Sequence, residues 1–383
     1  MWFKSLYLYR LHATPDLSID ALQEALAEHA CRPLGGSEAR RLGWQTPAGR
    51  NSQLYVHEIQ GQRLLCALRQ ERLLPAGVVR DEVEERAANR EAAEGRPLPR
   101  REKQALKEQV YEEFLPRAFY RSQRIDVWWD TTRNLIAINT GSRKRAEETL
   151  DLLRMTLGSL KVTPLATQTL PVRAMTQWMI DPAARPPMLI LGDRVELKAK
   201  GDDGVHSARQ VDLDSDEIQQ VVAGGREATR LAMHIEGLAS FVLTDDLGIK
   251  SLHFDDALLD EASQTDDADD AVLRMETDFF LMAKALGGMI DNLIDWLGGE
   301  AVGHAPLLDG VSPAGALMPD GTEDPLYEQT KAFVVGSGHA SVSAVQRQFK
   351  IGYNRAARFI EALEAEGIIA PINNSGSRKV LAA

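Results

Sequence analysis

The sequence predicts an α+β domain, a linker and a C-terminal winged helix-turn-helix. Over the first three hundred residues, segments that alternate between apolar and polar residues are interspersed with segments that have apolar residues at helical spacing. A stretch rich in Gly and Pro and poor in charge then occupies residues 302–323. With 383 residues, 44% of them hydrophobic, the chain is long enough for two domains with separate cores. We therefore predict domains at 1–301 and 324–383, joined by the linker.

Periodicity and turn residues predict the elements of the first domain in chain order. Residues 95–99, Gly-Arg-Pro-Leu-Pro, interrupt a charge-rich helical stretch, and because proline breaks a helix interior, they mark the tip of a helical hairpin. The predicted elements are a strand within 2–11, a helix at 17–29, two strands around Gly61 within 53–74, the helical hairpin at 80–115, a β-hairpin at 124–140 that turns at 131–134, and a helix at 145–160.

Proline residues punctuate the second half of this domain. Between residues 164 and 187 they predict loops, and further strands are predicted at 194–199 and 241–244. The most apolar stretch, Phe279 to Leu297, is interrupted by one lysine and two aspartates at helical spacing. It predicts a buried amphipathic helix, because a membrane-spanning helix needs about 20 apolar residues in succession.

A helix predicted within residues 352–367 has two distinct faces. Asn354, Arg355 and Arg358 lie on one of them, near the helix N-terminus, where such side chains can bond to adenine and guanine edges in a major groove. The other face is an apolar stripe at i, i+3, i+4 and i+7, which predicts contact with a core: Ala356, Phe359, Ile360 and Leu363.

The neighbouring segments complete a winged helix-turn-helix. A helix and a short turn at 341–352 precede the reading helix, and a strand and a turn at 368–377 follow it. Arg378 and Lys379 come next, at the base of the predicted wing, where cations contact DNA phosphates. The whole segment therefore predicts a DNA-binding module.

The net charge of −12 is unevenly distributed along the chain. Residues 245–300 carry 15 Asp and Glu against 3 Lys and Arg, whereas residues 115–145 carry 7 Lys and Arg against 2 Asp. Because the acidic segment accounts for the whole net charge, a basic surface elsewhere is compatible with it. The acidic average does not exclude nucleic acid as a partner.

Arginines alternate with aromatic residues in the basic segment. Arg117, Arg121 and Arg124 are suited to hold phosphates, and Phe119 and Tyr120 to stack or wedge at a groove. The alternative is that Phe119 lies in a core or at a subunit contact and that the arginines face water. We expect the arginines to lie near DNA. We expect Phe119 to lie in a core or at a subunit contact, and not to insert into DNA.

A second polar site comes before an acidic helix start at residues 214–217. Arg209 is a candidate phosphate contact there, with Gln210 beside it. The alternative is that Arg209 is an arginine on a surface loop.

The segment from Asp324 to Ala383 resembles the gamma domain of the FtsK DNA translocases. The strings ASVSAVQRQFKIGYNRAARFIEALE and NNSGSRKVLA carry the resemblance. It implies recognition of a short polar G-rich octamer in duplex DNA through the base readers and wing cations named above, and contact with the XerD recombinase. A translocase motor is not expected, because no segment matches the phosphate-binding loop G-x-x-x-x-G-K-S/T.

Residues 1–301 resemble the recombination-associated RdgC family. The matching strings, in that family's order and spacing, are MWFKSLYLYRL, FLPRAFYRS, RAEETLDLLRMTLGSLKVTPL and TDFFLMAKALGGMIDNLIDWLGGEA. The resemblance implies a cytoplasmic, nucleoid-associated protein that forms a ring-shaped homodimer around duplex DNA and restrains RecA-driven recombination. Phe119 lies in the LPRAF block, and Arg209-Gln210 stand where the family has a basic residue followed by Gln. Members end near position 300, so the linker and the C-terminal module are additions.

The sequence predicts no enzyme, metal or cofactor. The aspartates Asp266, Asp267, Asp269 and Asp270 could hold a metal for nuclease chemistry, but the loop lacks the Gly and distal Glu of a calcium-binding loop, so an acidic surface loop is favoured. The N-terminus lacks a signal-peptide layout, so we expect a cytoplasmic protein without a membrane segment. Four histidines are isolated in the sequence and lack the Cys and His spacing of a metal site: His57, His206, His234 and His253.

These predictions combine into one hypothesis. The chain is expected to be a non-enzymatic clamp on double-stranded DNA, a ring-shaped homodimer that modulates recombination by a RecA-type recombinase. The winged helix would direct it to short polar G-rich sites. One alternative is a partner adaptor whose winged helix docks a site-specific recombinase of the XerD type, and a less favoured one is a metal-dependent nuclease.

Overall fold

The computed structural model divides into two compact units, residues 1–305 and 306–383. The first unit is described nearly throughout, and the second in short segments. The described residues are 2–13, 15, 17–199, 204–264, 270–301, 316–317, 323–324, 326–337, 345, 348–349, 359–360, 362–364 and 368–370.

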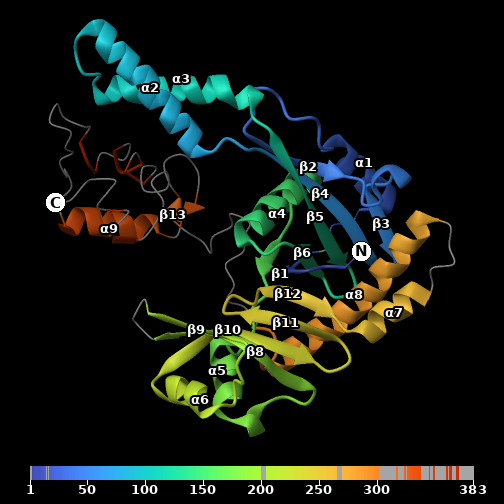
Figure 1. Ribbon diagram of the computed structural model, residues 1–383. Helices are drawn as coiled ribbons and strands as arrows, with labels where there is room; N and C mark the ends of the chain where they lie inside the picture. Colours follow the sequence, from blue (N-terminus) through green and yellow to red (C-terminus); the bar gives the residue numbers. More distant parts are fainter. Residues whose placement is uncertain are drawn as a thin grey trace. The chain divides into compact units, whose positions relative to one another are not determined.

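One long twisted sheet runs through the first unit (Figure 1). Its strands are β1 (Leu6–Leu11), β2 (Arg40–Gln45), β3 (Val56–Ile59), β4 (Gln62–Arg72), β5 (Tyr120–Asp130), β6 (Leu135–Asn139), β7 (Val162–Pro164), β8 (Leu189–Ala199), β9 (Val205–Arg209), β10 (Arg226–Ile235), β11 (Ala239–Thr244) and β12 (Ile249–Phe254). Their order is β2-β4-β5-β6-β1-β12-β11-β10-β8-β9, with β3 paired to β4 and β7 to β1. The two halves of the sheet meet where Leu6 of β1 lies opposite Ile249 of β12.

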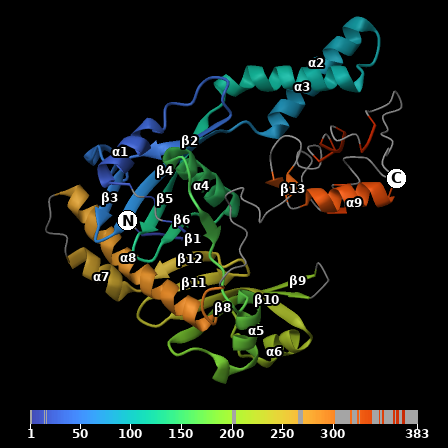
Figure 2. The ribbon, with the colours of Figure 1, turned by 180° about the vertical axis from the view of Figure 1, so that it is seen from behind.

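Helices pack on this sheet, except for a hairpin of two helices that projects from it (Figure 2). The hairpin is formed by α2 and α3, which have a small apolar core of their own around Leu106 and Val110. The helices of the first unit are α1 (Ile19–Glu28), α2 (Ala76–Glu94), α3 (Arg100–Phe114), α4 (Arg143–Leu157), α5 (Pro171–Ile180), α6 (Asp216–Ala223), α7 (Asp256–Gln264) and α8 (Ala271–Trp296).

The two faces of the sheet are covered unequally. Side chains alternate along each strand, so β1–β6 pack against α4 on one face and against α8 on the other. In the other half, Leu231, Leu243 and Ile249 point into a core shared with α5, α6 and α8. None of the helices described here covers the opposite face of β8–β12 (Figure 1). The arrangement leaves one side of this half of the sheet open to solvent.

The α+β prediction is confirmed, and the elements with strong local signals are present. The helical hairpin turns at Gly95, where φ is +65°, and β3 and β4 flank Gly61 as predicted. The prediction of loops between residues 164 and 187 was wrong, because residues 171–180 form α5. Pro171 occupies the start of that helix, where a proline has no intrahelical hydrogen bond to lose. Strands β2, β7, β9, β10 and β12 were not predicted.

Gly43 in β2 allows the chain at Cys31 to approach closely. A Cβ at position 43 would lie 2.6 Å from the Cys31 Cα. Hydrogen bonds hold that segment in place, since the Cys31 amide donates to the Trp44 carbonyl at 2.8 Å. We expect Gly43→Ala to lower the free energy of unfolding by about 1–3 kcal/mol, measured by urea denaturation. Gly77→Ala, where nothing lies within 4 Å of the added carbon, is the control; equal midpoints for the two variants would contradict the prediction.

The second unit has a small core around α9 (Tyr327–Ser337). Phe359, Ile360 and Leu363 are fully buried in it, which confirms the predicted apolar stripe, while Ala356 lies outside the described residues. Within the region predicted as linker and its boundary, β13 (Ala316–Leu317) pairs with β14 (Glu323–Asp324). Ile368 and Ile369, in the strand predicted to open the wing, are buried in this core, whereas the predicted turns at 350–352 and 373–377 and the cations Arg378 and Lys379 lie outside the described residues.

Candidate nucleic-acid interface

Cations gather on the uncovered side of β8–β12, which we call the open sheet face. Pairing of β8 with β9 places Arg194 opposite Arg209, and pairing of β8 with β10 places Glu196 opposite Arg230. These residues of β8, β9 and β10, together with residues of β11 and β12, surround a hollow of about 150 Å³. The residues that line the hollow are Arg194, Val195, Glu196, Ser207, Arg209, Arg230, Val242, Lys250 and Ser251.

Three of the four cations that line this hollow are not neutralised by a described carboxylate. Arg230 forms an ion pair with Glu196, with 2.9 Å between Nη1 and Oε2. Arg194, Arg209 and Lys250 form no ion pair with any residue that the structure describes. Uncompensated cations on an exposed surface produce a positive potential that attracts an anionic polymer.

A second hollow, of about 350 Å³, adjoins the N-terminus of α4. Its lining includes the cations Lys4 and Arg145 and the amides of Gln123 and Asn139. The amide of Leu252 in β12 donates to the Lys4 carbonyl at 3.0 Å, so this hollow borders the open sheet face. The positive end of the α4 dipole adds to its attraction for anions.

Charged groups of α4 and β10 both act on the Tyr7 phenol. Burial raises the pKa of the Tyr7 phenol, and so does the nearby Asp246 carboxylate. Arg143 of α4 and Arg230 of β10 both lower it, so both guanidinium groups lie near the same ring. We call the combined surface of Lys4, Arg145 and the open sheet face the basic track.

The structure places Arg209 on the basic track. It is the last residue of β9, so the alternative that it lies on a loop is wrong; the pairing of β9 with β8 could not be read from the sequence. Gln210 follows with φ at +56°, and it is exposed. Among the described residues that were predicted to contact DNA, Arg209 is the one that lies within the hollow of the open sheet face.

The predicted arginine cluster is divided between two faces of β5. Arg121 and Arg124 are three residues apart on the strand, and because successive side chains alternate, they point to opposite faces. Arg121 lies 3.6 Å from Glu71, and Arg124 bonds to Asp126 at 2.6 Å. Arg117 is exposed in the turn after α3. These arginines therefore do not form a single phosphate-binding patch.

Phe119 is not a core residue. It exposes 86% of its surface, and the adjacent Tyr120 exposes 56%. Both lie where α3 turns into β5, at the base of the projecting hairpin (Figure 1). The prediction of a core position was wrong because Phe119 lies in the exposed connection between α3 and β5. That Phe119 is a contact residue stays a prediction.

Several predicted residues lie outside the described part of the chain. These are the base readers and wing cations Asn354, Arg355, Arg358, Arg378 and Lys379, and the aspartates Asp266, Asp267 and Asp269.

The described residues contain no group of three or more His, Cys, Asp or Glu arranged to hold a metal ion. Asp270 caps α8 by accepting from the Val272 amide at 2.8 Å. Two histidines that are isolated in the sequence have carboxylate partners in space: His57 with Glu276 at 2.6 Å and His234 with Asp255 at 3.1 Å. Among the described helices, none has both the length and the apolarity needed to cross a bilayer.

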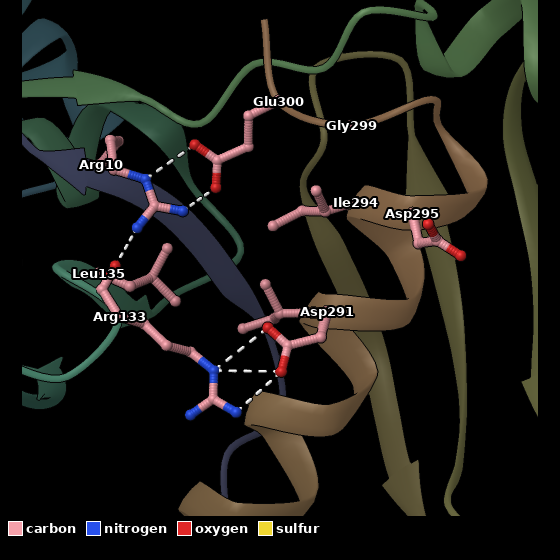
Figure 3. Close-up of a pocket in the computed structure, with 9 residues that line it drawn as sticks. Arg10, Arg133, Leu135, Asp291, Ile294, Asp295, Gly299 and Glu300 are labelled. Atoms are coloured by element: carbon pink, nitrogen blue, oxygen red, sulfur yellow. Dashed lines mark hydrogen bonds and ion pairs between the residues drawn. The ribbon is translucent and has the colours of Figure 1, made fainter.

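A cavity of about 290 Å³ between β1, the β5–β6 turn and α8 was not predicted (Figure 3). Arg10 forms an ion pair with Glu300 and donates to two backbone carbonyls of the β5–β6 turn. Arg133 bonds to Asp291 at 2.8 Å and to Asp130 at 3.0 Å, and the Asp291 carboxylate raises the pKa of Arg133. Since both guanidinium groups are already paired, this network joins α8 and the end of the first unit to the sheet.

Comparison with known proteins identifies both parts of the chain. Residues 1–300 match the family model described as "Putative exonuclease, RdgC", and residues 321–383 match the one described as "Ftsk gamma domain". The Recombination-associated protein RdgC of Tolumonas auensis is 39% identical over 301 residues, which cover 78% of this chain and 99% of that protein. The proteins of the same name from Yersinia pestis and Yersinia pseudotuberculosis are 37% identical over 302 residues, or 79% of this chain and 99% of theirs. Both resemblances seen in the sequence are confirmed, and the chain belongs to the RdgC family and carries an FtsK gamma domain beyond it.

Proposed function

We propose that this protein binds double-stranded DNA and is not an enzyme. The observation that supports it is the open sheet face, where the exposed Arg194 and Arg209 and the half-buried Lys250 have no carboxylate partners among the described residues. Such cations bind phosphates by releasing counterions and do not read sequence. No aromatic residue lines the hollow, which favours a duplex backbone over a stacked single strand.

Two copies of the chain enclose the duplex as a ring, with Phe119 at the contact between them. A phenylalanine with 86% of its surface exposed supports this contact, because a large apolar side chain gains free energy when a partner covers it. The relatives are named recombination-associated proteins. By occupying DNA at the nucleoid, the ring restrains recombination by a RecA-type recombinase.

The C-terminal domain directs the ring to short polar G-rich sites. Its match to the gamma domain supports this role. The linker holds the second DNA-binding surface at a roughly millimolar effective concentration. Because both surfaces belong to one molecule, even a weak sequence reader shifts where the ring resides.

The proposal is tested by fluorescence anisotropy of the full-length protein on a duplex of scrambled sequence at several salt concentrations. For each copy of the chain, the three unpaired cations of the open sheet face in contact with phosphates give a slope of log K against log salt of about −2.7, at about −0.9 for each phosphate. Affinity that does not change with salt would exclude the open sheet face as the binding surface.

Glu196 is the single carboxylate among the residues that line the hollow. It pairs with Arg230 at 2.9 Å and so neutralises one cation of the open sheet face. We expect Glu196→Gln to bind the scrambled duplex up to about tenfold more tightly, with a salt slope steeper by about 0.9, because one more phosphate contact becomes available. Glu217→Gln on α6, on the covered side of the sheet, is the matched control. Weaker binding by Glu196→Gln would contradict this prediction.

The family description names an exonuclease, so cleavage is the second candidate. It is tested by incubating end-labelled duplex with the protein and Mg²⁺. Release of nucleotides that a chelator abolishes would replace the non-enzymatic proposal, whereas intact duplex under conditions of full binding supports it.

A further inference from the structure

The position of Phe119 depends on a short connection between two elements. Helix α3 ends at Phe114, a single turn spans Leu115–Arg117, and β5 begins at Tyr120. Phe119 itself belongs to neither element, and nothing packs over most of its side chain. Its direction is therefore set by whatever holds the backbone of this connection.

Arg72, the last residue of β4, makes the contacts that hold it. The Arg72 Nη1 donates to the carbonyl oxygens of Pro116 at 2.9 Å and Ala118 at 2.8 Å. Its Nη2 donates to the carbonyl of Gly35 at 3.2 Å. One planar guanidinium thus joins the connection before Phe119 to a loop from a distant part of the sequence.

The backbone on either side of Arg72 continues the same attachment. The Leu73 amide donates to the Phe119 carbonyl at 2.7 Å, and the Arg72 amide donates to the Ala39 carbonyl at 2.8 Å. Arg72 forms no ion pair with the described residues, so its charge is directed at carbonyl groups. Hydrogen bonds from a charged donor are about twice as strong as neutral ones, which makes this a firm attachment.

We infer that Arg72 is a positioning residue for self-association: it fixes the direction in which Phe119 meets a second copy of this chain. The inference rests on the proposed contact through Phe119. Arg72 pairs with Tyr120 at the end of the β4–β5 ladder, which continues for ten further residue pairs toward Gln62. Loss of the guanidinium therefore affects the connection and leaves the sheet and the basic track in place.

The test is a double-mutant cycle on self-association, measured by sedimentation equilibrium of the full-length protein. Phe119→Ala and Arg72→Gln are each expected to weaken dimerisation at least tenfold. If Arg72 acts through Phe119, the double variant is no weaker than the weaker single variant, because neighbouring residues that act together are not additive. Arg80→Gln, an exposed arginine near the start of α2, is the control and dimerises normally.

A second readout separates positioning from general loss of structure. Hydrogen exchange in Arg72→Gln is expected to increase at least tenfold at residues 115–119 and to stay unchanged in β8–β12. If the glutamine variant does not fold, Arg72→Lys, which keeps the charge but not the planar fork, replaces it in the cycle.

The outcomes distinguish the inference about Arg72 from the proposed dimer contact through Phe119. If Phe119→Ala dimerises normally, the proposed contact itself fails. If Phe119→Ala weakens dimerisation but Arg72→Gln does not, or if the two effects add, Arg72 does not position Phe119 and the inference is overturned.

Discussion

Reversing the charge of Arg194 and Arg209 together is expected to weaken binding to a scrambled duplex roughly a hundredfold, at about 1.5 kcal/mol for each charge-assisted contact. These side chains lie opposite each other on β8 and β9, and neither is neutralised by a described carboxylate. The variant Arg194→Glu/Arg209→Glu places negative charge directly in the hollow. Its affinity is measured by anisotropy at low and moderate salt, and its salt slope is expected to fall by about 2.

A matched control distinguishes the open sheet face from net charge alone. Arg173→Glu/Lys284→Glu changes the charge of the protein by the same amount, but on α5 and α8, which cover the other side of the sheet. This variant is expected to bind almost as tightly as the wild type. Equal losses in both variants would mean that the chain's overall field, and not the open sheet face, determines affinity.

Removing the predicted base readers is expected to abolish sequence preference. The variant Asn354→Ala/Arg358→Ala is compared with the wild type on two duplexes, one scrambled and one carrying the polar G-rich octamer that gamma domains recognise. Each bidentate base contact contributes about 1–3 kcal/mol of discrimination. The octamer preference of the wild type should disappear while the salt-dependent baseline remains.

Arg378→Ala provides the contrast, because a phosphate contact carries no sequence information. It is expected to weaken binding to both duplexes by the same factor. If the wild type binds both duplexes equally, the C-terminal domain does not read bases, and the adaptor function takes precedence. Charge reversal at Arg355 and Arg358 would then be expected to remove binding of a XerD-type recombinase without changing DNA affinity.

Local patterns in the sequence predicted much of the fold. The hairpin of α2 and α3, the strands around Gly61 and the β5–β6 turn all depend on interactions between residues close in the chain. The prediction was wrong for α5, because its prolines were taken to indicate loops. Pro171 stands at the start of the helix, where a proline is compatible with helical structure. The prediction missed β2, β7, β9, β10 and β12, whose strand conformation depends on pairing with other segments of the chain.

The candidate site was predicted only in part. Arg209 was identified from the sequence, but Arg194, Arg230 and Lys250 were not, since each is one charged residue on a separate strand. In contrast, the clustered arginines of residues 117–124 gave the strongest local signal, but Arg117 lies in the turn before β5, and Arg121 and Arg124 lie on opposite faces of that strand. A linear cluster of charge does not specify a surface when side chains alternate along a strand.

The sequence by itself determined the family, the presence of an additional C-terminal domain and the helices and hairpins with short-range signals. Only the tertiary structure decided which cations share a face, that Phe119 is exposed, and that Arg72 holds the connection beside it. The physical reason is the pairing of strands that are distant in sequence. Helices cover one side of β8–β12 and leave the other open, and no periodicity within a single segment contains that information.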